Sequence, residues 1–346
     1  MSILGIIGGL AVDQAGLRRL LDTTTRQVST GQKAESFGGL APEARRAIDL
    51  RGEVGRREAY AAAADRALGR ADATQTVLGR LQAIASNLST EALRARTLGP
   101  TGAEALAQTA RAALAEAAAL LNTRHGGEYL FGGSDVARPP VPEADGIADG
   151  AMATAIADAV ATLDADNAAT VLADTATVMN DAATTPFSAF LENEGATEAP
   201  RAVQAAEGER VAIGVFANRS QDGALETSWG RELLRNLAVL AALTPALAEE
   251  GGGWSPLLDG VTDSMGAVTA GLAAEQGQLG TAEQRLGALR DRHKDSMVVL
   301  RTQLGAVEEV DLAAASAELS QVKARLEASY EATGMVARLS LAALLR

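Results

Sequence analysis

Cysteine is absent from the chain of 346 residues, and histidine is nearly so. The first absence excludes disulfides, thiolate metal sites and cysteine nucleophiles, although it leaves the compartment open. His125 and His293 are the only histidines, and neither stands in a metal-binding spacing such as HExxH. We therefore expect both histidines to have structural roles.

Aromatic residues are also scarce, at 3% of the chain, and there are only 9 prolines. Hydrophobic residues make up 47%, but much of this share is alanine. Alanine favours the helix strongly and fills little volume. The composition therefore favours slender helices in close contact over a thick globular core.

Positive charge is in deficit, with a formal net charge of −13. No basic stripe typical of nucleic-acid binding is visible, and the acidic balance disfavours anionic membranes. No run approaches the roughly 18 uncharged apolar residues that a membrane span needs. The apolar N-terminus lacks a basic region and a cleavage site, so we expect any export to proceed without a cleaved signal peptide.

Catalytic signatures are missing as well. The glycines of GIIGGLAVDQAG (5–16) follow no strand, so they do not form a phosphate loop, and no Walker or GxSxG pattern occurs. The carboxylates are spread over helix faces rather than paired. We expect no enzymatic activity, no cofactor and no metal site.

Helical periodicity is abundant. An amphipathic helix is predicted over residues 10–31, and Gly31 is its expected end. A connector follows to Pro42, and a helix of more than fifty residues is then predicted as far as Leu98. Its apolar residues recur at spacings of three and four, which is typical of a coiled-coil seam: Leu78, Leu81, Ala85, Leu88, Ala92 and Ala95.

The C-terminal part repeats this pattern. A long helix is predicted to about residue 305, with a stripe of residues seven apart: Leu272, Leu279, Leu286, His293, Leu300 and Val307. A last helix follows Glu308 and Glu309. Helices this long cannot bury their stripes alone, so we expect the two ends of the chain to pack on each other.

Two segments interrupt the helices. GGEYLFGGSD (126–135) places apolar residues between glycines, which predicts a short strand or hairpin that turns sharply. Residues 137–221 have a weaker helical period, and ERVAIGVFA within them is expected to form strands. We expect this middle segment to be a small inserted domain.

The predicted fold is therefore mainly α: a long antiparallel coiled-coil rod built from both chain ends, with a short β-hairpin and a small inserted α+β or β domain. We expect residues 1–40 and 305–346 to be terminal assembly helices that are flexible in the monomer. Residues 41–136 and 222–304 would form the rod, and residues 137–221 the outer domain.

Three stretches of the sequence resemble the flagellin superfamily. RQVSTGQKAES (26–36) is similar to the "ISTGKR"-type segment near the flagellin N-terminus, and residues 308–345 are similar to its C-terminal helix. Within GGEYLFGGSD, the run Tyr129, Leu130, Phe131, Gly132 and Gly133 resembles a motif of the hook-filament junction, or hook-associated, branch. Together the likeness covers about residues 10–135 and 225–346. FGGLAPEARRA (37–47) departs from the usual Asp-containing segment, which leaves the local turn open.

The resemblance implies an extracellular structural protein of the bacterial flagellum. Its terminal helices would assemble into a ring between another hook-associated protein and flagellin, after delivery by an export chaperone and the flagellar export apparatus. The expected assembly interface comprises Leu10, Leu17, Leu20, Val28, Leu319, Val322, Leu326, Leu339, Leu341 and Leu344. From the residues alone, the same stripes are equally compatible with an ordinary internal helical bundle.

Alternatives remain at this level. Flagellin itself, the bulk subunit of the filament, shares the terminal motifs. A secreted helical effector is a further possibility, although such proteins lack the paired terminal motifs. The GGEYLFGGSD segment favours the junction protein over bulk flagellin.

Overall fold

The computed structural model describes the backbone of residues 3–220, 223, 227–249 and 252–344; within these ranges it describes the side chains of residues 9, 11–336 and 338. Its chain forms two compact units. Unit 1 comprises Met1–Ala59 and Arg292–Arg346, and unit 2 comprises Tyr60–Asp291. Each unit is described separately below.

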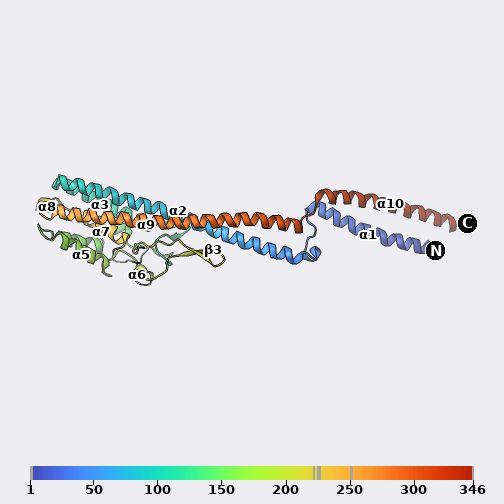
Figure 1. Cartoon of the computed structure of the whole chain (residues 1–346), viewed down its shortest axis with the longest axis horizontal. Coiled ribbons are helices and arrows are strands. Elements are labelled where there is room, and N and C mark those ends of the chain that lie inside the picture. The colour runs from blue at the N-terminus through green and yellow to red at the C-terminus, as the bar shows by residue number, and fades with distance from the viewer. Residues whose placement is uncertain (1–2, 221–222, 224–226, 250–251, 345–346) are drawn as a thin grey trace. The chain divides into compact units, whose positions relative to one another are not determined.

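Unit 1 is built from helices at both ends of the chain. It contains α1 (Ile3–Thr30), the short 3-10 helix η1 (Phe37–Leu40), α10 (Leu312–Leu344), the first residues of α2 (Ala44–Leu98) and the last of α9 (Trp254–Glu308). Figure 1 shows α1 and α10 side by side, with the two termini at the same end of this pair.

Local sequence explains where these helices end and begin. Gly31 has a φ of 72°, a left-handed conformation that ends α1, as the sequence predicts. Asp311 caps α10, because its carboxylate accepts hydrogen bonds from the backbone N–H groups of Ala313 (2.9 Å) and Ala314 (3.2 Å). The first helix begins earlier than predicted, at Ile3 rather than residue 10.

Unit 2 contains the remainder of α2 and α9, which run antiparallel. Gln75 donates to the Gln276 carbonyl (2.9 Å), and farther along Arg96 pairs with Asp259. The predicted apolar seams of this unit are buried, which confirms the coiled-coil spacing. The buried seam residues are Leu78, Leu81, Ala85, Leu88, Ala92, Ala95, Leu272, Leu279 and Leu286.

A tight reversal joins α2 to α3 (Pro100–Leu121). Gly99 has a φ of 61°, and Pro100 takes the first helical position, where its missing N–H costs nothing. A Cβ on Gly102 would lie 2.8 Å from the Cα of Ala95, so the two helices approach closely through small residues. Abundant alanine thus permits the slender packing that the composition suggests.

The remaining elements of unit 2 cover this helical layer. They are η2 (Ala144–Gly146), α4 (Ala151–Val160), α5 (Ala168–Asn180), α6 (Ala189–Glu192), η3 (Glu194–Ala196), α7 (Trp229–Ala241) and α8 (Pro245–Glu249). Helix α7 contacts α3, α4 and α5. One continuous core therefore extends from the helical layer into residues 141–191.

Two small antiparallel hairpins complete unit 2. The first joins β1 (Arg124–His125) to β2 (Glu128–Tyr129), and the second joins β3 (Ala202–Ala206) to β4 (Glu209–Ala212). Gly126 and Gly127 both have positive φ, which is the type I′ turn that matches strand twist. The mainly α fold with small hairpins is confirmed.

Some details differ from the sequence predictions. Leu130 and Phe131 follow the first hairpin instead of lying within it, because the ladder ends at Tyr129. Residues 137–221 carry more helix than their weak period suggests, and they share the core of unit 2. The division into terminal, rod and outer parts, with flexible ends in the monomer, therefore stays a prediction.

Candidate assembly interface and family motif

Helices α1 and α10 hold each other through polar contacts on an antiparallel seam. Gln14 Nε2 donates to Thr333 Oγ1 (2.8 Å) and to the Ser329 carbonyl (3.3 Å). One turn farther along, Arg18 Nε donates to the Tyr330 hydroxyl (2.9 Å), and its guanidinium lies 5.6 Å from the ring centroid. These contacts bring the two chain ends together, as the sequence predicts.

The apolar part of this seam is thin. Val322 and Leu326 of α10 are buried, with Leu326 8% exposed, whereas Leu17, Val28 and Leu319 are only half-buried. Leu20 is 37% exposed. The side chains of Leu10, Leu339, Leu341 and Leu344 lie outside the described residues. The described part of the predicted interface is therefore half covered in the single chain, and its role in assembly stays a prediction.

Large apolar side chains remain on the surface of the same pair. Val12 is 69% exposed and Met335 is 60% exposed, and Leu312 and Tyr330 are also exposed. Single exposed apolar residues are common in folded proteins, and these four are spread along the two helices. Each could contact another helix of the same kind.

The connector after α1 is fastened to the end of α9 and to the link that leads into α10. Lys33 N–H donates to the Glu308 carbonyl (2.7 Å), and Val310 N–H donates to the Gly31 carbonyl (2.9 Å). The Lys33 ammonium adds hydrogen bonds to the carbonyls of Ala306 (2.6 Å) and Val307 (3.0 Å). The ammonium thus satisfies carbonyls at the end of α9, where backbone acceptors lack helical partners.

A bidentate ion pair reinforces this junction. Arg51 of α2 donates to both carboxylate oxygens of Glu308 (2.7 and 2.9 Å), and this hydrogen bonding raises the pKa of Arg51 above its ordinary value. Beneath it, a small apolar cluster contains Leu40, Ala47 and Val307. The two stretches that resemble flagellin termini, 26–36 and 308–345, therefore meet here by direct hydrogen bonding.

The family motif lies in unit 2, at the first hairpin. Leu130 and Phe131 are buried, and the Phe131 ring meets the Trp229 indole edge-to-face at 6.3 Å between centroids. The Phe131 carbonyl accepts from Ala217 N–H (3.1 Å). Gly133 has a φ of 64°, and an added Cβ would lie 2.5 Å from the Phe216 ring. Leu130 and Phe131 thus belong to the core of unit 2, whereas Tyr129 is half-buried.

Two arginines fasten the motif to its surroundings. Arg70 of α2 donates to the carbonyls of Tyr129 (2.7 Å) and Leu130 (3.2 Å), and Arg201 pairs with Glu128 (2.6 Å). The hydrogen bond from Arg201 holds the pKa of Glu128 below its ordinary value. Burial lowers the pKa of Arg70, and the nearby charge of Arg201 adds to this effect.

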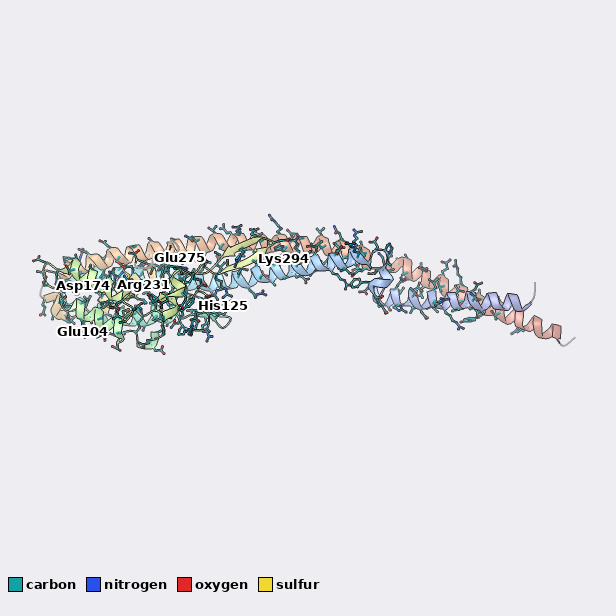
Figure 2. The ribbon with its side chains drawn as sticks, turned by 90° about the horizontal axis from the view of Figure 1, so that it is seen from below. Glu104, His125, Asp174, Arg231, Glu275 and Lys294 are labelled. Carbon is teal, nitrogen blue, oxygen red and sulfur yellow. The ribbon has the colours of Figure 1, made fainter. Side chains whose placement is uncertain are left out.

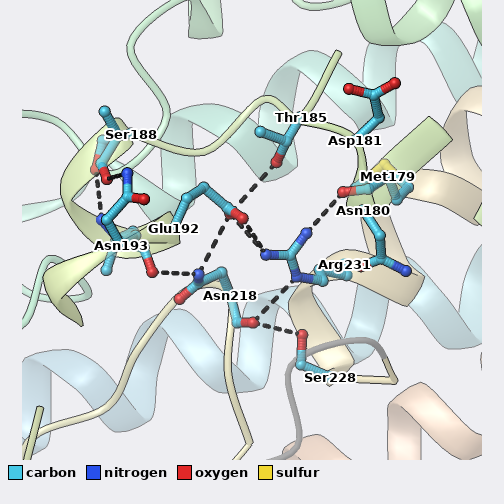
Figure 3. A network of polar contacts seen from close by, with 12 residues as sticks. Met179, Asn180, Asp181, Thr185, Ser188, Glu192, Asn193, Asn218, Ser228 and Arg231 are labelled. Carbon is cyan, nitrogen blue, oxygen red and sulfur yellow. Dashed lines mark hydrogen bonds and ion pairs between the residues drawn. The ribbon is translucent and has the colours of Figure 1, made fainter. Parts of the chain in front are cut away.

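A second buried network was not predicted from the sequence. Arg231 of α7 donates to both oxygens of Glu192 (2.6 Å each) and to the Met179 carbonyl (2.6 Å), as Figure 3 shows. Asn218 joins it by donating to the Leu191 carbonyl (2.9 Å). The only sequence signal was an arginine within a strongly apolar helix, which by itself names no partner.

The described residues include both histidines and most of the carboxylates of the chain. Among them, no group of three or more histidine, cysteine, aspartate or glutamate side chains could hold a metal ion. Within the same residues, no helix is both long enough and apolar enough to cross a bilayer. His293 is buried on the α9 stripe and His125 is exposed at the first hairpin.

Comparison with known proteins gives two findings. Residues 262–345 match the bacterial flagellin C-terminal helical region. A protein from Vibrio parahaemolyticus, described as a flagellar hook-associated protein, has a similar structure, with a TM-score of 0.55. The similarity covers 77% of this chain and 97% of that chain at 10% sequence identity, so it concerns the fold. No curated protein sequence matches the chain significantly.

Proposed function

We propose that this protein is a structural, non-catalytic component of the bacterial flagellum that assembles through its paired terminal helices. One observation carries the proposal: the two chain ends are hydrogen-bonded to each other, and the C-terminal one matches the flagellin C-terminal region. The exposed apolar side chains of α1 and α10 support contact with further helices.

Within this class we propose the junction role. The protein would form a ring that links another hook-associated protein to the flagellin filament, outside the cell, after export with a chaperone through the flagellar apparatus. Two observations support this choice: the Tyr129-Leu130-Phe131 motif and the likeness in fold to a protein described as hook-associated. The match of residues 262–345 to flagellin favours the second candidate, the bulk filament subunit.

A deletion strain separates the two candidates. If the protein is a junction adaptor, cells that lack the gene will be non-motile and will release flagellin monomers into the medium. A plasmid copy of the wild-type gene is the control and should restore filaments. Cells that still build a shortened or altered filament would identify a bulk subunit instead, and fully motile cells would contradict both roles.

A further inference from the structure

Negative charge is concentrated in one part of the chain. Residues 139–200, called here the acidic segment, contain eleven of the 44 acidic residues and none of the 31 lysines and arginines. Neither histidine lies in this segment. It spans η2, α4, α5, α6 and η3 of unit 2. A run of one sign this long makes a strong local field.

Most of these carboxylates face solvent. Glu192 is held by Arg231, and Glu198 accepts from Ser134 N–H (3.1 Å). The other nine side chains are exposed, and within the described part of the chain none of them takes part in an ion pair. They are Glu143, Asp145, Asp149, Asp158, Asp164, Asp166, Asp174, Asp181 and Glu194.

A groove elsewhere in unit 2 carries the opposite charge. It lies between α2 and the two hairpins and has a volume of about 630 Å³, and Arg66, Arg70, His125 and Arg201 line it. Its size lies within the range of ligand-binding clefts. The groove is open to solvent, because Arg66 and His125 are both exposed.

The carboxylates of the groove leave part of this positive charge uncompensated. Glu128 is shared between Arg201 (2.6 Å) and Arg70 (3.4 Å), and Asp65 pairs with Arg290 at 3.5 Å. Among the described residues, no hydrogen bond or ion pair involves the side chain of Arg66. The groove therefore presents a free guanidinium beside a two-arginine site.

Helix α5 of the acidic segment lies away from the groove of its own chain, although the segment itself ends at Pro200, next to Arg201 of the groove. Figure 2 shows Asp174 near one end of unit 2 and His125 farther along it, and Figure 1 likewise places α5 away from the β3–β4 hairpin. Two complementary surfaces separated on one molecule can meet only between molecules. A contact of this head-to-tail kind propagates into rings or helical arrays.

We propose that the groove lined by Arg66 and Arg201 docks the acidic segment of a second copy of this chain. The proposal rests on the self-assembly stated above and adds a contact outside the terminal helices. Charge complementarity would steer the copies into register and make their association dependent on salt. Arg66 would contribute the free guanidinium charge to this contact. Arg201 would contribute a second guanidinium, which is half-exposed.

Sedimentation velocity of the full-length chain measures its self-association, at ionic strengths of about 20 mM and about 300 mM. Arg66→Glu should weaken self-association at low salt by about tenfold, since it replaces an attraction by a repulsion. Arg111→Glu is the matched control, because Arg111 is an exposed arginine of α3 without an ion pair among the described residues. It should associate like the wild type.

A second variant tests which segment occupies the groove. It combines Asp145→Asn, Asp149→Asn, Asp158→Asn and Asp174→Asn, and it should weaken self-association as Arg66→Glu does. Replacing the same four residues by lysine should restore association when that protein is mixed with the Arg66→Glu protein. Equal association of Arg66→Glu and Arg111→Glu, or unchanged association of the asparagine variant, would overturn the docking contact. A motile deletion strain would overturn the flagellar role and leave this contact standing.

Discussion

At the scale of single residues, glycines determine how closely the elements of unit 2 approach. Gly230 lies near the start of α7, and a Cβ built there would be 1.8 Å from the Ala217 carbonyl oxygen. In a helix, glycine costs about 1 kcal/mol relative to alanine. The chain accepts this cost because no side chain fits between α7 and the segment that follows β4.

Replacing this glycine should therefore destabilise the protein. Gly230→Ala should lower the free energy of unfolding by about 1–3 kcal/mol, because the backbone must move to relieve the overlap. Gly266→Ala in α9 is the matched control: nothing lies within 4 Å of its Cβ position, so it should stabilise by about 0.5–1 kcal/mol. Urea unfolding followed by circular dichroism measures both, and equal effects of the two changes would contradict the close contact.

Buried arginines are the second feature at this scale. Arg70 and Arg231 are both buried, and each donates to carbonyls of segments distant in sequence. The planar guanidinium can serve several acceptors at once, which a lysine ammonium of the same charge cannot do in this geometry. These side chains thus join loops to helices.

At the scale of elements, the first hairpin depends on a charged contact. Glu128 of β2 has a lowered pKa because Arg201, next to β3, donates to it. A carboxylate whose pKa is lowered on folding stabilises the native state at pH values above its unfolded pKa of about 4.3. This contribution disappears as the pH falls through the lower pKa of the folded state.

Acid should therefore weaken unit 2 partly through Glu128. The urea midpoint should fall as the pH drops below about 4.3, and Glu128→Gln should show a smaller fall, since its amide does not titrate. The difference will be small, because the carboxylate is partly exposed and solvent screens the pair. An identical pH profile for the wild type and Glu128→Gln would contradict the lowered pKa.

At the scale of the whole molecule, the proposed function depends on the terminal pair. Removing residues 320–346 deletes Val322 and Leu326, the buried side chains opposite α1. The truncated protein should still be secreted but should fail to assemble, because α1 would lose the seam that orders it. Electron microscopy of cells and immunoblots of the medium measure the two outcomes.

A milder pair of variants controls for the size of this deletion. Val322→Asp buries a charge in the seam and should also prevent assembly, whereas Lys323→Asp changes the exposed neighbour and should be tolerated. Assembly of the truncated protein between hook and filament would refute the role of the C-terminal helix.

Much of the helical architecture could be predicted, because the stripes of α2 and α9 recur over many turns. The hairpin at Gly126 and Gly127 was also accessible, since two adjacent glycines suit a turn with two positive φ values. The helices α4 and α5 were underestimated, because alanine, threonine and aspartate give a weak apolar period. The partners of Arg70 and Arg231 could not be predicted, since backbone carbonyls leave no mark in a sequence.

The sequence by itself determined the long helices, their ends at Gly31 and Gly99, the terminal motifs and the lack of any catalytic signature, because these depend on local periodicity and composition. Only the tertiary structure decided that residues 141–191 share the core of unit 2, and that a groove with a free arginine lies apart from the acidic helix α5. Those features depend on which distant segments pack together, and packing is a property of the whole chain rather than of any window within it.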